Sequence, residues 1–197
     1  MQEFDAVERS PRDNARIVKS AVSPRPIAWI STRSEAGVDN LAPYSSYNYV
    51  SSENPVVLFN SPNEDHGGLK DTARNALERG AFAVNVVTEP LLVEMDSTSR
   101  RLPPEESEFD RFDVERAPCR RIDAPRVAEA VVTMECTLHD SLTVHDRIVV
   151  LGDVEYFHVA EAVLTDGRID MGKLPTVGRL GGPYYTVSDP VEFERQF

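Results

Sequence analysis

Short apolar runs separated by turn residues dominate the first half of the chain. Runs rich in Ile, Val, Trp and Phe that end at Gly, Asn or Pro are typical of the strands of an antiparallel meander. We therefore expect strands at residues 27–32, 38–50, 56–61 and 82–87. Four serines lie in or beside these strands, at positions 45, 46, 51 and 52. Because serine is a poor strand former, this cluster indicates a role other than packing.

Helical signals interrupt these runs at three places. Ser10-Pro11 is typical of an N-cap followed by proline at the first helical position, and it predicts a helix that ends at Ser23-Pro24. Apolar residues at helical spacing predict a second helix over 69–79, which Gly80 ends. A third helix is expected over 91–95, with a proline at its start.

The second half of the chain again favours strands. The pattern predicts long strands over 126–139 and 147–159, and an Asp-Gly pair predicts a tight hairpin over 164–169. Residues 97–121 lack a clear period, and a loop of that length is usually functional or disordered. The pattern shows no repeat and no linker, so we expect a single domain over residues 1–197. Its fold class is mainly β, a β-barrel with short flanking helices.

Composition and charge narrow the class of protein. With 41% hydrophobic and 27% charged residues, the chain is an ordinary globular protein. A net charge of −12 argues against a nucleic-acid partner, so any anionic ligand must be met by a local cluster of donors. We find no signal peptide and no apolar run long enough for a membrane span, and Cys119 and Cys136 form no CxxC motif. A reduced, cytoplasmic protein without membrane contact is therefore expected.

Familiar catalytic motifs are missing from the sequence. The four histidines show neither HExxH nor zinc-finger spacing, so we expect no metal site. There is no GxSxG nucleophile motif and no Walker loop, and Gly178-x-x-Gly181 lacks the GxGxxG of a dinucleotide fold. The sequence therefore names no catalytic residue.

The start of the helix expected over 69–79 is a candidate phosphate site. A helix N-terminus presents unpaired N–H groups and the positive end of the helix dipole. Lys70 and Thr72 belong to its first turn, and Ser45 and Ser46 are further candidate donors. Each also has a structural interpretation, because Thr72 suits a local cap, Lys70 a solvated charge and the serines a turn. The residues alone leave both interpretations open.

Several collinear motifs resemble those of the flavin reductase-like family. They are residues 24–32 (PRPIAWIST), 40–48 (NLAPYSSYN), 70–75 (KDTxxN), 82–85 (FxVN), 107–109 (SEF) and 178–184 (GRLGGxY). The resemblance implies an FMN-binding split β-barrel of Greek-key type. One departure is that Ser46 and Tyr47 stand where phenylalanine is frequent in the family, which leaves the exact phosphate donors open.

The resemblance also implies which residues contact the cofactor. Hydroxyls at Ser31 and Thr32 are expected near the flavin ring or ribityl chain, residues 40–48 around the ribityl-phosphate, and residues 70–72 at the phosphate. The expected FMN-binding set is Ser31, Thr32, Asn40, Ala42, Pro43, Ser45, Ser46, Asn48, Lys70, Asp71, Thr72, Arg179 and Tyr184. A role for His66, beside the phosphate turn, is a further hypothesis.

The activity implied by the resemblance is that of an NAD(P)H-dependent flavin reductase. In this hypothesis NADH or NADPH is the co-substrate, reduced FMN passes to an oxygenase or another acceptor, and the protein is a homodimer. The cofactor carries the redox chemistry, so a dedicated acid–base pair is not required. Two alternatives are an FMN-binding electron carrier or storage protein without NAD(P)H activity, and a structural protein that binds no flavin. The sequence does not choose between NADH and NADPH.

Overall fold

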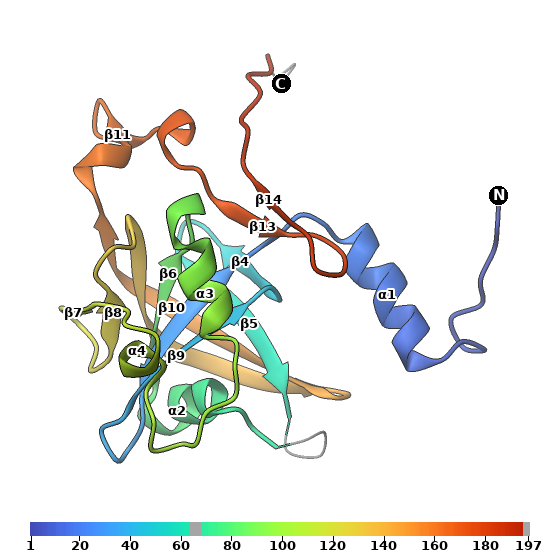
Figure 1. Cartoon of the computed structure of the whole chain (residues 1–197), viewed down its shortest axis with the longest axis horizontal. Coiled ribbons are helices and arrows are strands. Elements are labelled where there is room, and N and C mark those ends of the chain that lie inside the picture. Colours follow the sequence, from blue (N-terminus) through green and yellow to red (C-terminus); the bar gives the residue numbers. More distant parts are fainter. Residues whose placement is uncertain (64–67, 195–197) are drawn as a thin grey trace.

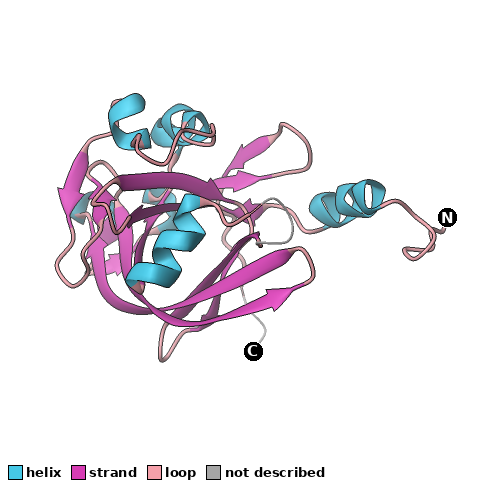
Figure 2. Ribbon diagram, turned by 90° about the horizontal axis from the view of Figure 1, so that it is seen from below, coloured by secondary structure: helices cyan, strands magenta, loops and turns pink. Residues whose placement is uncertain are grey.

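The computed structural model describes residues 1–63 and 68–194. Its centre is a seven-stranded antiparallel sheet with the strand order β3-β2-β6-β9-β10-β5-β4 (Figures 1 and 2). These strands are β2 (Ala28–Arg33), β3 (Asp39–Tyr44), β4 (Tyr47–Ser51), β5 (Val56–Pro62), β6 (Ala81–Val86), β9 (Val132–Val144) and β10 (Arg147–Val159). The mainly β class predicted from the sequence is thus confirmed.

The two edge strands of this sheet, β3 and β4, are neighbours in the sequence. Only Ser45 and Ser46 separate them, yet β3 pairs with β2 and β4 pairs with β5 at the other end of the strand order. The sheet must therefore curl until its two ends meet, which makes it a barrel. Because β3 and β4 do not pair with each other, the barrel is split at this point.

Two predicted strands are each divided in the structure. The strand expected over 38–50 is broken at Ser45 and Ser46, where the chain crosses between the sheet edges, and the Ser46 Oγ donates a 2.9 Å hydrogen bond to the Asn60 carbonyl. The strand expected over 126–139 consists of β8 (Pro125–Val127), which pairs with β7 (Arg116–Pro118), and of β9 in the large sheet. In both cases strand-forming residues lie on each side of a short break, and the partner of each half is set by tertiary pairing that the local pattern does not reveal.

The remaining strand predictions are confirmed. β10 begins and ends at the predicted residues, β5 is one residue longer than predicted, and β2 and β6 are each displaced by one residue at both ends. The hairpin over 164–169 is formed by β11 (Leu164–Thr165) and β12 (Arg168–Ile169), with Gly167 at φ +74°. A second small sheet joins β1 (Arg25–Pro26), β13 (Val177–Arg179) and β14 (Tyr185–Val187).

The predicted helices are present with shifted ends. α1 (Pro11–Ala21) begins after the Ser10 cap, whose Oγ accepts a 3.2 Å hydrogen bond from the Asp13 N–H. α2 (Asp71–Arg79) begins two residues later than expected and ends at Gly80, which has φ 66°. α3 (Leu92–Ser97) follows a 3₁₀ turn at Glu89–Leu91. No helix among residues 1–63 and 68–194 is long and apolar enough to cross a membrane.

Residues 97–121 form an ordered segment that contains α4 (Glu108–Arg111) and β7. Phe109 and Val114 anchor this segment, because both are buried in a cluster with Trp29, Leu41 and further apolar side chains. Alternate residues of β2 point the other way, into a second cluster around Phe59, Phe82 and Val150. Both faces of β2 are therefore buried. The sparse apolar residues of 97–121 carry no period, but they suffice to hold the segment against the barrel.

Glu135 is a fully buried carboxylate on β9. It accepts hydrogen bonds from the backbone N–H groups of Arg120 (2.7 Å) and Arg121 (2.6 Å), and the His158 Nε2 lies 2.5 Å from its Oε1. Burial raises the pKa of Glu135, but these two N–H groups and His158 outweigh that effect and hold the pKa below its ordinary value. Glu135 thus attaches the loop before β8 to the barrel.

We expect E135Q to lower the free energy of unfolding by about 3 kcal/mol near neutral pH, because its amide group would meet N–H donors that need an acceptor. A carboxylate with a lowered pKa stabilises the fold above its unfolded-state pKa and loses this contribution as the pH falls through the folded-state pKa. Urea unfolding should therefore show a difference between wild type and E135Q that shrinks below about pH 4. E155Q, an exposed change on β10, is the control. A difference that persists at acid pH would contradict the interpretation.

Candidate functional site

A cavity of about 300 Å³ lies between β3, the start of α2 and the start of the segment that follows α3. Its cationic lining side chains are Lys70, Arg74, Arg100 and Arg101. Arg74 pairs with Asp71. The other three form no ion pair with any residue in the described ranges. In a chain of net charge −12, this cavity is a local concentration of unneutralised positive charge, and we call it the cationic cavity.

The start of α2 adds further donors to the cationic cavity. Lys70 is the N-cap residue with extended backbone, and its side chain makes no capping hydrogen bond. Lys70, Asp71 and Thr72 all line the cavity. Helix N–H groups without a side-chain cap, beside free cations, form a favourable environment for an anion. The sequence predicted a phosphate at this helix start, with Ser45 and Ser46 as further donors, and these two serines do not line the cavity.

Asn40 of β3 joins the elements around the cationic cavity through its side chain. Its Oδ1 accepts hydrogen bonds from the hydroxyls of Thr72 on α2 (2.7 Å) and Thr32 on β2 (3.3 Å). Its Nδ2 donates to Glu108 Oε2 on α4 (2.8 Å), which also accepts from the Leu41 N–H (2.9 Å). All four of these polar side chains are buried. Thr72 is thus not a local cap, because its hydroxyl proton goes to Asn40.

Two buried hydroxyls near Thr72 lack partners. Tyr44 Oη and Ser61 Oγ make no hydrogen bond within the described part of the chain. Burial raises the pKa of Tyr44, and the nearby hydroxyls of Thr72 and Ser61 oppose that effect. The three hydroxyls of Tyr44, Ser61 and Thr72 thus lie close together beside the first turn of α2, and Tyr44 and Ser61 do not line the cationic cavity.

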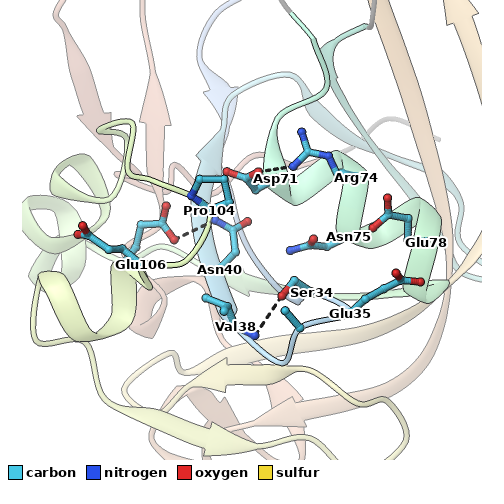
Figure 3. Close-up of a pocket in the computed structure, with 12 residues that line it drawn as sticks. Ser34, Glu35, Val38, Asn40, Asp71, Arg74, Asn75, Glu78, Pro104 and Glu106 are labelled. Carbon is cyan, nitrogen blue, oxygen red and sulfur yellow. Dashed lines mark hydrogen bonds and ion pairs between the residues drawn. The ribbon is translucent and has the colours of Figure 1, made fainter.

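A second cavity of about 170 Å³ adjoins the cationic cavity and carries the opposite charge. Figure 3 shows it between α2, with Asn75 and Glu78, and the turn that carries Ser34 and Glu35. Its carboxylates come from Glu35, Asp71, Glu78, Glu106 and Glu108. We call it the acidic cavity. The two cavities share a wall that consists of Asn40, Asp71, Arg74, Pro104 and Glu108.

The structure brings together five residues of the predicted FMN-binding set. The five that line the cationic cavity are Asn40, Ala42, Lys70, Asp71 and Thr72. Ser31 and Thr32 are fully buried, and Ser31 Oγ donates to the Pro125 carbonyl at 2.6 Å. The hydroxyl of Thr32 donates a hydrogen bond to Asn40 and does not line the cavity.

The other predicted residues lie outside the lining of this cavity. Pro43, Ser45, Ser46 and Asn48 belong to the end of β3, the crossing between the sheet edges and β4. Arg179 on β13 contacts the Tyr185 hydroxyl and donates to the Gly182 carbonyl at 2.8 Å. Tyr184 is exposed. Contacts of these residues with a cofactor stay predictions. His66 lies outside the described residues.

Sequence reasoning missed the wall opposite α2. Residues 98–102 and Glu108 line the cationic cavity, and Arg100 and Arg101 supply half of its cations. An arginine pair in a strongly acidic chain was the available signal. Nothing local in the sequence could assign this pair to the cavity, because the segment is held by distant packing of Phe109 and Val114.

Comparisons with known proteins identify the family of the chain. The family model for the flavin reductase like domain matches residues 20–174. An uncharacterized protein of Aquifex aeolicus is 37% identical over 171 residues, which cover 86% of this chain and 87% of the relative. These two findings cover most of the chain.

Two solved structures share the whole fold. Nitrilotriacetate monooxygenase component B from Bacillus cereus matches with a TM-score of 0.92 and 32% identity over 99% of this chain and 98% of its own. The 2-nitrobenzoate 2-nitroreductase of Pseudomonas fluorescens matches with a TM-score of 0.88 and 26% identity over 98% of this chain and 96% of its own. The match of the family model, together with these relatives, shows that the chain is a member of the flavin reductase-like family with its split-barrel fold.

Proposed function

We propose that this protein is an NAD(P)H-dependent flavin reductase that binds FMN in the cationic cavity. The observation that supports the proposal most strongly is the cluster of Lys70, Arg100 and Arg101 at the uncapped start of α2, in a chain of this family that is otherwise acidic. A single phosphate group needs this kind of local cluster, because the overall charge of the protein repels it.

The residues present fit such a ligand. Lys70, Arg100 and Arg101 would neutralise the phosphate charge, and the first N–H groups of α2 would donate to its oxygens. The buried hydroxyls of Tyr44 and Ser61 lie near Thr72 of the same turn, outside the lining of the cavity. When bound, FMN would supply the redox chemistry, and the protein would supply binding and orientation.

The proposed acceptor of reducing equivalents is a partner oxygenase or another acceptor. The Bacillus cereus relative is described as a component of a monooxygenase, and the Pseudomonas relative as a nitroreductase, so both are linked to oxidoreductase systems. We extend the first of these relationships to this chain as a proposal. A reduced cytoplasmic compartment is proposed with it, where NADH and NADPH are available as donors.

We also propose a homodimer in which α1 contacts the second copy. Figure 1 shows α1 standing away from the barrel, and none of its residues is buried. Ile17 and Val18 on α1 and Val22 at its end are 43%, 58% and 59% exposed. The edge strand β4 likewise exposes Tyr49 and Val50. Apolar surface on a projecting helix and on a free sheet edge is typical of an interface between subunits.

The function can be tested first by spectroscopy. The purified protein, mixed with FMN, should show perturbed flavin absorbance bands, and NADH or NADPH should bleach them rapidly because electrons flow from the nicotinamide to the flavin. Continued turnover with excess FMN is expected. Bands that neither nicotinamide bleaches would contradict the reductase proposal and favour an electron carrier. FMN absorbance that the protein leaves unperturbed would contradict the assignment of the cavity.

The charge of the cavity predicts the effect of two substitutions. K70A and R101A should each weaken FMN binding roughly tenfold, since each removes a charge-assisted contact to the phosphate. Quenching of flavin fluorescence measures the dissociation constant. R168A, which removes an exposed arginine of β12 outside the cavity, should bind FMN as the wild type does. Equal affinities for all four proteins would place the phosphate elsewhere.

The α1 contact predicts the outcome of an assembly experiment. Light scattering should give a mass near twice 22.0 kDa for the wild type. The double variant I17D/V18D should be monomeric, because two carboxylates would be buried without partners in the interface. V93D, at a 72% exposed apolar position on α3, is the control and should remain dimeric. A wild-type mass near 22.0 kDa would contradict the proposal.

A further inference from the structure

Glu108 lies in the wall between the cationic cavity and the acidic cavity. It is the first residue of α4, it is only 6% exposed, and it lines both cavities. The motif that contains it, residues 107–109, was noted in the sequence, but the site residues predicted there did not include it. A buried carboxyl between cavities of opposite charge is a group whose charge state depends on what fills them.

The hydrogen bonds of Glu108 are one-sided. Asn40 Nδ2 and the Leu41 N–H both donate to Oε2, at 2.8 and 2.9 Å. The Glu108 N–H also lies near its own carboxyl, and no other described residue donates to Oε1. Oε1 is therefore the oxygen that remains for the cavities. The carboxyl is fixed in place through Oε2 and is able to accept or release a proton at Oε1.

The charged groups around Glu108 come from three elements. α2 contributes Asp71, Arg74 and Glu78, with Lys70 at its start; the segment before α4 contributes Arg100, Arg101 and Glu106; and the turn before β3 contributes Glu35. Burial raises the pKa of Glu108 above its ordinary value, the N–H groups of Leu41 and of Glu108 itself and the Asn40 amide oppose this, and the charge of Asp71 adds to it. Glu108 thus titrates closer to neutral pH than an exposed glutamate does.

We propose that the binding of FMN in the cationic cavity is accompanied by the uptake of one proton from solvent by Glu108. This inference rests on the proposed function. A phosphate monoester carries close to two negative charges at neutral pH, and a carboxylate on the wall of the same cavity would repel it. Protonation of Oε1 removes that repulsion and leaves the hydrogen bonds to Oε2 intact. The affinity of the protein for FMN therefore depends on pH through the protonation of Glu108.

The sign of the effect follows from linkage. A ligand that binds the protonated form better raises the pKa of Glu108 in the complex above that in the free protein. The affinity for FMN is highest at a pH below the pKa of Glu108 in the free protein. It falls as the pH rises from that pKa to the pKa in the complex, and above the pKa in the complex it is weaker but constant. Proton uptake on binding is largest between them.

The test is isothermal titration of flavin-free protein with FMN in two buffers that differ in protonation enthalpy. Proton uptake is obtained from the difference in heat, and it is compared for wild type, E108Q and the control E106Q, whose carboxyl lines only the acidic cavity. Glutamine keeps an acceptor for Asn40 and Leu41 but does not ionise. We expect uptake in wild type and E106Q to exceed that in E108Q, and E108Q to bind FMN about tenfold more tightly than wild type at alkaline pH, which corresponds to about one unit of linked pKa.

Equal proton uptake by all three proteins would overturn this inference and leave the proposed function intact, whereas failure of all three to bind FMN would overturn both. If E108Q does not fold, the wild type is labelled with ¹³C-carboxyl glutamate and examined by infrared difference spectroscopy. The isotope shift separates glutamate from flavin carbonyl bands. Addition of FMN should then produce a protonated-carboxyl band, and the absence of that band would overturn the inference.

Discussion

The split barrel depends on one short connection, the two serines that join the edge strands of the sheet. Because β3 and β4 are separated only by Ser45 and Ser46 but pair at opposite ends of the strand order, the sheet has to curl through its full width. The curl fixes the position of β3 beside the first turn of α2, and the polar side chains at that junction follow from it. The serine cluster of the sequence is explained in part by this crossing, where a tight passage between sheet edges is more important than strand propensity.

The hydrogen bonds of the Asn40 side chain hold the elements around the cationic cavity together. Four separate elements meet through one amide side chain, since Thr32, Thr72 and Glu108 all bond to it. Each of these groups is buried, so leaving any of them without a partner would cost of the order of 1–3 kcal/mol. The network therefore holds α2, α4 and β3 in one arrangement and places the uncapped start of α2 opposite Arg100 and Arg101. Thr32, which was expected to touch the cofactor, has this supporting role instead of a place in the cavity lining.

The sequence was sufficient to predict the elements that depend on local residue patterns. Alternating or continuous apolar runs located β2, β5, β6 and β10, and proline and glycine signals located the helices. It was insufficient where contacts between distant residues determine the course of the chain. The strand break at Ser45 and Ser46 depends on which edge each half pairs with, and the ordered course of residues 97–121 depends on Phe109 packing against Trp29 and its neighbours. Half of the cations in the cavity come from that segment, so these cations could not be assigned to the site without the fold.

The separation of charge between the two cavities is the feature that connects the fold to chemistry. Asp71 and Arg74 pair within the shared wall, so neither adds a net charge to either side. Lys70, Arg100 and Arg101 remain unneutralised on one side, and Glu35, Glu78 and Glu106 line the other. Two opposite potentials a few residues apart favour a ligand with an anionic end and a neutral or cationic end. A flavin phosphate meets the first requirement, and the carboxyl of Glu108 lies where the two potentials meet.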